Sequence, residues 1–428
     1  MWRNLFTLGS IFPFTPADLS PAADPSKSYA AWRVRPGRRR CDTLQAESTK
    51  ESERSITPFK YIAASIIALL LVPALATAAD DITVVLFAGR RPSNIHLLAP
   101  GRTITDANGA SLPASKCSIT LTGIRRGVEC GGKTLSAAPF TLAAGDADPF
   151  FTVRIDGQAR RYNGTLRIAP DGERLACRLT VPLDDYVAAV LAAETIHDHP
   201  AYLEAMAILV RQHAIHAGNQ GERAVADDTR DQMFRGLPAG PRTDRLRRLA
   251  EKTARRRLLV EGRPAPVFYH ACCGGRTQPA WKPWPKLEGW RHLRGRADVD
   301  PSGEAWCKND KWYRWERRID AARFGDFLFK NWRVRQATRA PGYPMVVLAT
   351  GSLVPAWPFR IKLGRQLGWN TAPSDDFTLL RHEKRIVLTG RGFGHRVGLC
   401  QAGARAQAKA GKSAAQILRF YFPDATVE

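Results

Sequence analysis

A glutamate at the end of an apolar helix is the first residue of this chain that could do acid–base chemistry. Residues 183–195 have helical periodicity, with an apolar stripe formed by Val187, Val190 and Leu191. Glu194 follows these residues by seven, four and three positions, so it lies on the same face. Desolvation there raises the pKa of a carboxyl group, as a general acid requires. A structural ion pair, with Arg211 as a candidate partner, is the alternative, and periodicity favours neither.

The glycine-rich segment 390–404, GRGFGHRVGLCQAGA, is a second candidate site. The run 386–388 before it predicts a strand, and the Ala-rich stretch 401–420 after it predicts a helix. Glycines can adopt positive φ or allow a ligand to approach, so we expect the turn to display His395 beside a groove. A phosphate loop is disfavoured, because the spacing is G-x-G-x-x-x-G and too few residues follow Gly392 for a dinucleotide-binding half. A purely structural turn is the alternative.

Composition and charge limit the class of partner. With 428 residues and 44% apolar content, the chain can bury a sizeable core in two or three domains. A net charge of +24 favours an anionic partner or an anionic surface. The basic residues are scattered, as in the patch 245–257, and no zinc-finger, RNA-recognition or basic-zipper pattern occurs. No specific nucleic-acid partner is therefore expected.

The N-terminal region predicts export. Residues 1–59 form a leader without periodicity, which allows a true start downstream of Met1. In the segment 60–79, an apolar run is followed by an A-x-A cleavage pattern at residues 76–78, as in a secretory signal peptide. The run is short for a membrane span, although an uncleaved anchor within residues 61–79 is the alternative. We expect the protein in the periplasm or cell envelope.

Cysteine usage predicts disulfide bonding in that compartment. Removal of the leader leaves seven of the eight cysteines, an odd number, so at least one is free or bound otherwise. Cys117 and Cys130 flank a predicted hairpin and are the first expected pair. Cys307 with Cys272 or Cys273 is the second.

The pattern of apolar runs predicts an α+β fold without internal repeats. Residues 80–180 form a β-rich accessory part, with expected strands at 82–87, 95–98, 117–121, 151–155, 166–168 and 175–181. Residues 181–428 mix helices and strands, with expected helices at 183–193, 200–217 and 243–257 and strands at 267–269 and 345–348.

Four blocks, in this order, resemble the SpoIID family, which comprises stage II sporulation protein D and the LytB-type amidase enhancers. They are LDDYVAAVLAAETIHDHPAYLEAMAILVRQH at 183–213, VADDTRDQMFRG at 225–236, FYHACCGGRTQ at 268–278 and the glycine-rich segment from residue 392. The terminal ILRFYFP also agrees. The resemblance spans the chain from about residue 82 and implies one catalytic body with a central groove at 181–428.

The resemblance implies cleavage of peptidoglycan glycan strands by a lytic transglycosylase mechanism. Glu194 stands at the family's catalytic glutamate and would act first as general acid and then as base, giving 1,6-anhydromuramyl ends. The substrate supplies the nucleophile, so no second enzyme carboxylate is needed, unlike in a two-carboxylate hydrolase. The alternative is a non-catalytic peptidoglycan-binding module that enhances an amidase or another cell-wall enzyme.

The matched residues also imply substrate contacts. Arg211 could bind the muramic lactyl carboxylate or tune Glu194. The other implied contacts are His270, Gly274, Gly275, Thr277, Gly394, His395 and Gln401. A buried structural histidine is the alternative for both histidines. Three tryptophans near a Pro-rich loop could stack on sugars or belong to the core: Trp281, Trp284 and Trp290.

Several positions depart from the family pattern. Small hydroxyl residues are replaced by Ala271, Cys272, Cys273 and Cys400, and the other departures are Arg396, Ala402 and Gln212. No metal or other cofactor is expected, because neither His197 with His199 nor the cysteine pair with His270 shows a closed tetrahedral spacing. A cysteine–histidine nucleophile is disfavoured, because disulfide formation competes in an oxidising compartment.

Overall fold

The computed structural model describes residues 81–122, 125–145, 149–218, 222–322, 334–340, 343–348, 353–382 and 384–428. The leader and the candidate signal or anchor segment 60–79 lie outside the described residues. Among the described helices, none has both the length and the apolar character needed to cross a membrane.

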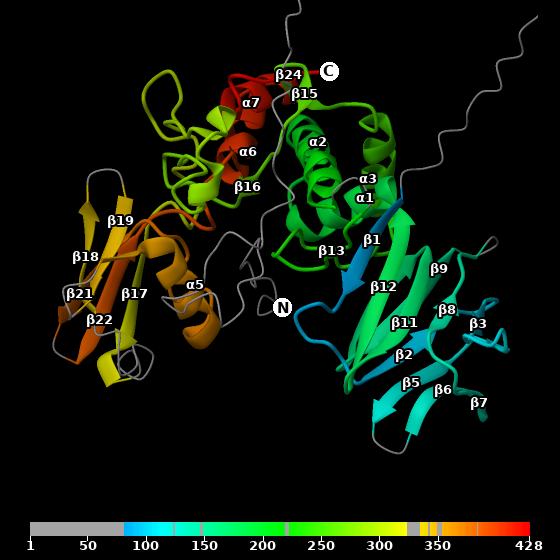
Figure 1. The fold of residues 1–428 in the computed structure, drawn as a ribbon. Coiled ribbons are helices and arrows are strands. Elements are labelled where there is room, and N and C mark those ends of the chain that lie inside the picture. The colour runs from blue at the N-terminus through cyan, green and yellow to red at the C-terminus, as the bar shows by residue number, and fades with distance from the viewer. Residues whose placement is uncertain are drawn as a thin grey trace, which may run out of the picture. The chain divides into compact units, whose positions relative to one another are not determined.

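The first hundred described residues are strands, as predicted (Figure 1). Their side chains alternate between buried and exposed, the pattern of strands with one face on a core. A seven-stranded sheet has the order β13-β1-β12-β11-β8-β3-β4. Its members are β13 (Val225–Ala226), β1 (Asp81–Leu86), β12 (Arg174–Pro182), β11 (Thr165–Asp171), β8 (Phe140–Leu142), β3 (Thr103–Thr105) and β4 (Ser111–Pro113). Because β13 pairs in parallel with β1, residues from both predicted parts of the chain share this sheet.

A second, six-stranded sheet in the same region has the order β10-β9-β2-β5-β6-β7. Its members are β10 (Gln158–Asn163), β9 (Phe150–Ile155), β2 (Asn94–Leu98), β5 (Cys117–Thr122), β6 (Arg125–Cys130) and β7 (Lys133–Leu135). Cys117 and Cys130 face each other across the β5–β6 hairpin and form the predicted disulfide. The second expected disulfide is wrong: Cys272, Cys273 and Cys307 are free, and the Cys273 and Cys307 sulfur atoms lie 3.6 Å apart.

Three helices follow the strand-rich part and lie together in Figure 1. They are α1 (Leu183–Glu194), α2 (Pro200–Ala217) and α3 (Pro241–Lys252). Helix α1 starts directly after β12, and α2 begins at Pro200, a residue suited to the first helical turn. The predictions for α1 and α2 are confirmed. The expected helix at 243–257 ends earlier, where Thr253 caps α3.

The glycine-rich segment leads into two short helices, not one. Its residues 391–398 connect β22 (Arg385–Gly390) to β23 (Leu399–Cys400), which pairs in parallel with β16 (Tyr269–His270). Helix α6 (Gln401–Lys409) and helix α7 (Ala414–Tyr421) come next. The expected single helix 401–420 is wrong, because Gly411 has φ 83° and Ser413 begins a new helix with a capping box.

A six-stranded antiparallel sheet with the order β17-β22-β21-β18-β19-β20 forms a smaller core with α5 (Ala356–Leu367). Its other strands are β17 (Trp315–Asp320), β21 (Phe377–His382), β18 (Val334–Ala340), β19 (Tyr343–Leu348) and β20 (Leu353–Pro355). A three-stranded sheet consists of β15 (Arg263–Pro264), β14 (Leu258–Val260) and β24 (Thr426–Val427). The predicted α+β class with a strand-rich N-terminal part is confirmed.

Candidate active site around Glu194

Glu194 is the last residue of α1, and its side chain is partly buried at the wall of a cleft. The apolar stripe that precedes it is fully buried, as the periodicity predicts. The Glu194 carboxylate accepts hydrogen bonds from the backbone N–H of Met233, at 2.9 Å, and from the side chains of Tyr269 and Gln401. Desolvation raises the pKa of Glu194 to about 7, although the three donors favour the charged form and oppose the shift. Glu194 can therefore carry a proton near neutral pH.

The alternative ion pair between Glu194 and Arg211 is not formed. Arg211 is buried, and its guanidinium bonds the Asp184 carboxylate and the backbone carbonyl of Ala250. These bonds join α2 to the first turn of α1 and to α3. Arg211 is absent from the lining of the cleft, and its expected contact with substrate stays a prediction that this placement does not favour.

A chain of hydrogen bonds fixes the tyrosine beside Glu194. The Tyr186 hydroxyl donates to Gln232 Oε1 at 3.2 Å, and Gln232 Nε2 donates to the Tyr269 hydroxyl oxygen at 2.9 Å. The proton of the Tyr269 hydroxyl then points to Glu194. Gln232 and Tyr269 belong to two of the blocks in the family resemblance, and the structure joins them at the carboxylate. Sequence reasoning missed both residues as site residues, because their link to Glu194 runs through side chains.

The two predicted histidines differ in their hydrogen bonding. His395 Nδ1 accepts the backbone N–H of Val397 at 3.1 Å, and its ring also bonds the Tyr269 backbone. Burial lowers the pKa of His395 well below its ordinary value, so this ring is neutral and holds Tyr269 in place. His270 Nδ1 bonds the Val397 carbonyl at 3.1 Å, whereas its Nε2 has no partner in the described part of the chain. His270 therefore lines the cleft but keeps this unpaired nitrogen buried.

The glycine-rich segment packs against the 268–274 segment of the same chain. A Cβ at Gly398, which has φ 70°, would lie 2.1 Å from the Phe268 carbonyl oxygen. The glycines of this segment thus allow the backbone of another part of the chain, and not a ligand, to approach closely. Arg396 has φ 54°, where the family pattern has glycine, and its guanidinium binds Asp375 and Asp376. We infer that these ion pairs offset the strained backbone.

The cleft beside Glu194 has a volume of about 1500 Å³ and mixes aromatic with charged side chains. Its tryptophans are Trp306, Trp312, Trp357 and Trp369. None of the three tryptophans considered from the sequence lines it, and Trp284 instead packs on the His395 ring in the core, with 5.1 Å between ring centroids. The indole N–H of Trp306 has no hydrogen-bond partner among the described residues. Sequence reasoning missed these four because their positions carry no local pattern.

The other expected contact residues divide between cleft and scaffold. Gly394 and Gln401 line the cleft with His270 and His395. Gly274, Gly275 and Thr277 are not among its lining residues. Thr277 is buried, and its hydroxyl oxygen accepts a hydrogen bond from the backbone N–H of Arg296 at 2.8 Å.

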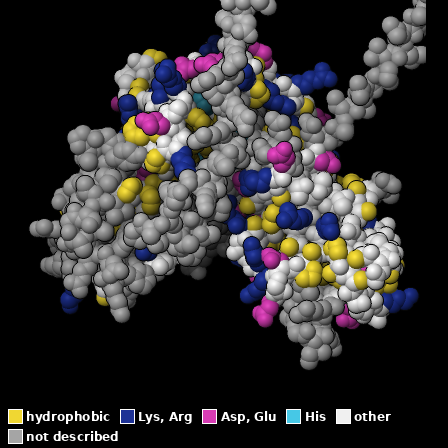
Figure 2. Space-filling view, viewed as in Figure 1, with side chains coloured by type: hydrophobic (Ala, Val, Ile, Leu, Met, Phe, Trp, Pro, Cys, Tyr) yellow, Lys and Arg dark blue, Asp and Glu magenta, His cyan; other side chains and the backbone are white. Residues whose placement is uncertain are grey.

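On the face shown in Figure 2, Lys and Arg side chains are spread over the surface without forming one patch.

Comparison with known proteins agrees with the motifs. The family model described as SpoIID, stage II sporulation protein, matches residues 172–259. Stage II sporulation protein D of Bacillus amyloliquefaciens is 26% identical over 267 residues, which cover 56% of this chain and 73% of that protein. An uncharacterized protein of Brachyspira hyodysenteriae is 25% identical over 271 residues, covering 61% of this chain and 70% of that protein. The amidase enhancer of Bacillus subtilis (strain 168) is 23% identical over 277 residues, covering 53% of this chain but 37% of that protein.

The family model ends before the Tyr269 block and the glycine-rich segment, but it contains Glu194 and the whole of α1 and α2. The chain therefore carries a SpoIID domain, and its resemblance to the family of stage II sporulation protein D and the amidase enhancers is confirmed.

Proposed function

We propose that this protein cleaves the glycan strands of peptidoglycan as a lytic transglycosylase, with Glu194 as the single acid and base. One observation carries the proposal: a carboxyl group with a pKa of about 7 lies at the wall of a large cleft, held by Met233, Tyr269 and Gln401. A pKa near the working pH suits a group that must donate a proton and then accept one.

In this mechanism, protonated Glu194 donates its proton to the glycosidic oxygen between two sugars. The bond from that oxygen to the anomeric carbon of muramic acid breaks, and the resulting carboxylate stabilises the developing positive charge. The carboxylate then removes the proton of the C6 hydroxyl of the same sugar, whose oxygen attacks the anomeric carbon. The products are a free hydroxyl end and a 1,6-anhydromuramyl end, and Glu194 is protonated again.

The composition of the cleft supports a sugar polymer with anionic groups. Its tryptophans offer flat apolar faces for sugar rings, and Gln401 adds a polar side chain beside Glu194. Arg405 and Lys409 on α6 also line the cleft and would attract the lactyl carboxylate of muramic acid. The proposal places the protein outside the cytoplasm, as the signal-like segment 60–79 predicts, with residues 181–428 as the catalytic body and residues 80–180 as an accessory part.

A second candidate function is binding without cleavage. One relative is named an amidase enhancer, which favours a module that binds peptidoglycan and assists a cell-wall amidase. The same cleft could hold a glycan strand without turnover. The two functions differ in whether Glu194 is needed for a chemical product.

The decisive experiment incubates the protein with purified glycan strands stripped of stem peptides and identifies the products by mass spectrometry. The wild type is expected to release anhydromuramyl ends, and Glu194→Gln to lose about 10²- to 10⁴-fold in rate. Glu204→Gln is a matched control, because Glu204 bonds Arg256 in the segment between α3 and β14 and lies outside the cleft. Glycan binding without products, equal in wild type and Glu194→Gln, would establish the binding module in place of the enzyme.

A further inference from the structure

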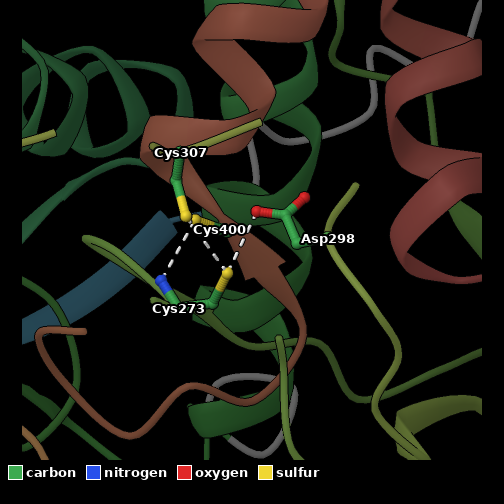
Figure 3. A group of neighbouring side chains, drawn as sticks. All are labelled: Cys273, Asp298, Cys307 and Cys400. Carbon is green, nitrogen blue, oxygen red and sulfur yellow. Dashed lines mark hydrogen bonds between the residues drawn. The ribbon is translucent and has the colours of Figure 1, made fainter. Parts of the chain in front are cut away.

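Three thiols and one carboxylate from distant segments meet at one buried point (Figure 3). Cys273 follows β16, Asp298 and Cys307 lie between β16 and β17, and Cys400 ends β23. All four ligand atoms lie within 4.8 Å of one another. Cys273 Sγ is 3.0 Å from an Asp298 oxygen and 3.6 Å from Cys307 Sγ. We call these four residues the thiol–carboxylate cluster.

The spacing of the thiol–carboxylate cluster suits a single tetrahedral metal ion. Zinc–sulfur bonds of about 2.3 Å place two tetrahedral sulfur ligands about 3.8 Å apart. The separation between Cys273 and Cys307 is close to that edge. A cluster of several iron atoms needs ligands farther apart than this group provides, and oxygen-preferring cations such as Mg²⁺ disfavour thiolates.

Backbone groups around the sulfur atoms favour their charged, metal-binding form. The N–H of Gly275 donates to Cys307 Sγ at 3.3 Å. Cys400 Sγ accepts two such bonds, from the N–H of Cys273 at 3.2 Å and of Gly403 at 3.3 Å. Cys400 also caps the N-terminus of α6, whose dipole favours negative charge. Donors of this kind stabilise thiolates and orient them on a metal.

Asp298 supplies a fourth ligand that needs a cation. Its side chain is completely buried, and the groups that act on it in the described part of the chain include no lysine or arginine. Tyr421 donates its hydroxyl proton to Asp298 Oδ1 at 2.8 Å, while Oδ2 faces Cys273. A buried carboxylate without a counter-charge is strongly disfavoured, and a divalent ion among the thiolates would supply that charge.

A disulfide explains the group less well than a metal. A disulfide between two of the three sulfur atoms would not explain why the third thiol and the carboxylate lie at the same point. By contrast, neither cysteine of the Cys117–Cys130 disulfide belongs to a group of candidate metal ligands among the described residues.

We propose that Cys273, Asp298, Cys307 and Cys400 bind one structural Zn²⁺ ion with closed tetrahedral coordination. The ion would join β16, β23 and the loop that holds Asp298 and Cys307. Cys273 lies three residues after His270, and Cys400 directly precedes Gln401, so the ion would brace the segments that surround Glu194. This role is independent of the proposed cleavage, because metal binding is measured without any substrate.

The test is the metal content of the full chain, purified without chelator and measured by plasma mass spectrometry. The wild type is expected to hold one zinc per chain, and Co²⁺ exchanged into it should give the intense visible bands of a tetrahedral thiolate site. Cys273→Ser, Cys307→Ser and Cys400→Ser should each lose most of the metal. Cys177→Ala is the matched control, because Cys177 is a buried free cysteine in β12, outside the thiol–carboxylate cluster, and it should keep full content.

Two further results would overturn the assignment. A metal-free wild type in which peptide mapping finds a disulfide among these cysteines excludes the site, and this measurement needs no variant to fold. Cys272 has its sulfur near Cys307 and Cys400 without joining the group of four. Full metal in Asp298→Asn together with loss in Cys272→Ser would replace Asp298 by Cys272 as ligand and contradict the proposal.

Discussion

Two desolvated carboxyl groups of this chain share a chemical environment but differ in access. The Glu194 carboxyl group accepts a hydrogen bond from the Tyr269 hydroxyl, and the Asp298 carboxyl group accepts one from the Tyr421 hydroxyl. Burial raises the pKa of both carboxyl groups, to about 7 for Glu194 and to about 6 for Asp298. Glu194 faces an open cleft among neutral donors, whereas Asp298 is closed in by sulfur atoms.

The difference shows how surroundings decide the use of a desolvated acid. An acid at an open wall can pass its proton to a substrate, so its unfavourable burial becomes useful in catalysis. An enclosed acid has no substrate to reach, and it becomes stable when a cation replaces its proton. The two carboxyl groups therefore respond to different perturbations, and the expected effects below run from the largest to the smallest.

Metal removal is expected to have the largest effect on stability. Structural zinc sites contribute about 10 kcal/mol or more of binding free energy in small domains, and several kcal/mol lost from a body of this size lowers the melting temperature by about 10 °C or more. Calorimetry with and without a strong chelator measures the change. Glu194→Gln should show the same decrease as wild type, because it leaves the thiol–carboxylate cluster intact. Equal melting temperatures with and without bound zinc would show that the ion has no structural role.

Tyr421→Phe is expected to weaken metal binding without abolishing it. The Tyr421 hydroxyl orients Asp298, and loss of a group that orients a metal ligand typically reduces metal affinity about 10- to 100-fold. Competition with a coloured zinc chelator measures the affinity. At saturating zinc the variant should cleave glycan at the wild-type rate, because Tyr421 is absent from the cleft lining. An unchanged zinc affinity would mean that the Tyr421 hydroxyl is not needed to orient Asp298.

The sequence revealed one of the two carboxyl groups because its signal is local. Glu194 lies on a helix whose apolar spacing is visible within twelve residues, and α1 has the predicted face. Asp298 gives no such signal, since its partners Cys273, Cys307 and Cys400 are separated by 34 and 93 residues along the chain. No ligand spacing typical of zinc sites exists in that order, so only the fold brings the group together.

The same contrast explains the remaining successes and failures. The strands of the N-terminal part were predictable because each alternates over a few residues. The proposed substrate contact of Arg211 stays a prediction, and the Ala250 carbonyl that it bonds was not predictable because only the path of α3 brings it there. The cleft tryptophans come from the region between β16 and β17 and from α5 and the loop after it, and a short window cannot show that they converge.

Replacement of Glu194 should make stability less dependent on pH. The pKa of Glu194 rises on folding from an ordinary value of 4.5 to about 7, so its contribution to stability is full below 4.5 and lost as pH rises through 7. The neutral side chain of Glu194→Gln avoids this loss. The variant should therefore gain about 1–3 kcal/mol relative to wild type between pH 4 and pH 8, with the lower values allowing for partial exposure.

Urea unfolding at several pH values measures this gain. Titratable groups that interact with Glu194 include three tyrosines, Tyr186, Tyr202 and Tyr269. Burial raises the pKa of each, so they stay neutral in this range. Glu204→Gln, which removes a carboxyl group outside the cleft, serves again as the control. A Glu194→Gln curve parallel to wild type would show that this carboxyl group titrates as an ordinary exposed glutamate.

Tyr269→Phe should give a small but diagnostic change. The Tyr269 hydroxyl stabilises the charged form of Glu194, so its removal raises the pKa of Glu194 further. A neutral hydrogen bond contributes about 0.5–1.5 kcal/mol, which corresponds to a rise of about 0.5–1 pH unit. The alkaline limb of the pH–rate profile should move up by that amount, and the NMR titration of the Glu194 carboxyl carbon should move with it.

Tyr186→Phe offers a graded comparison, because Tyr186 reaches Tyr269 only through Gln232. Its effect on the same titration should have the same direction and be smaller. A merely structural role for Tyr269 would lower the rate at every pH and leave the titration of Glu194 in place. That outcome would separate the tyrosine beside Glu194 from the tyrosine beside Asp298, since only the second would then act on its carboxyl group.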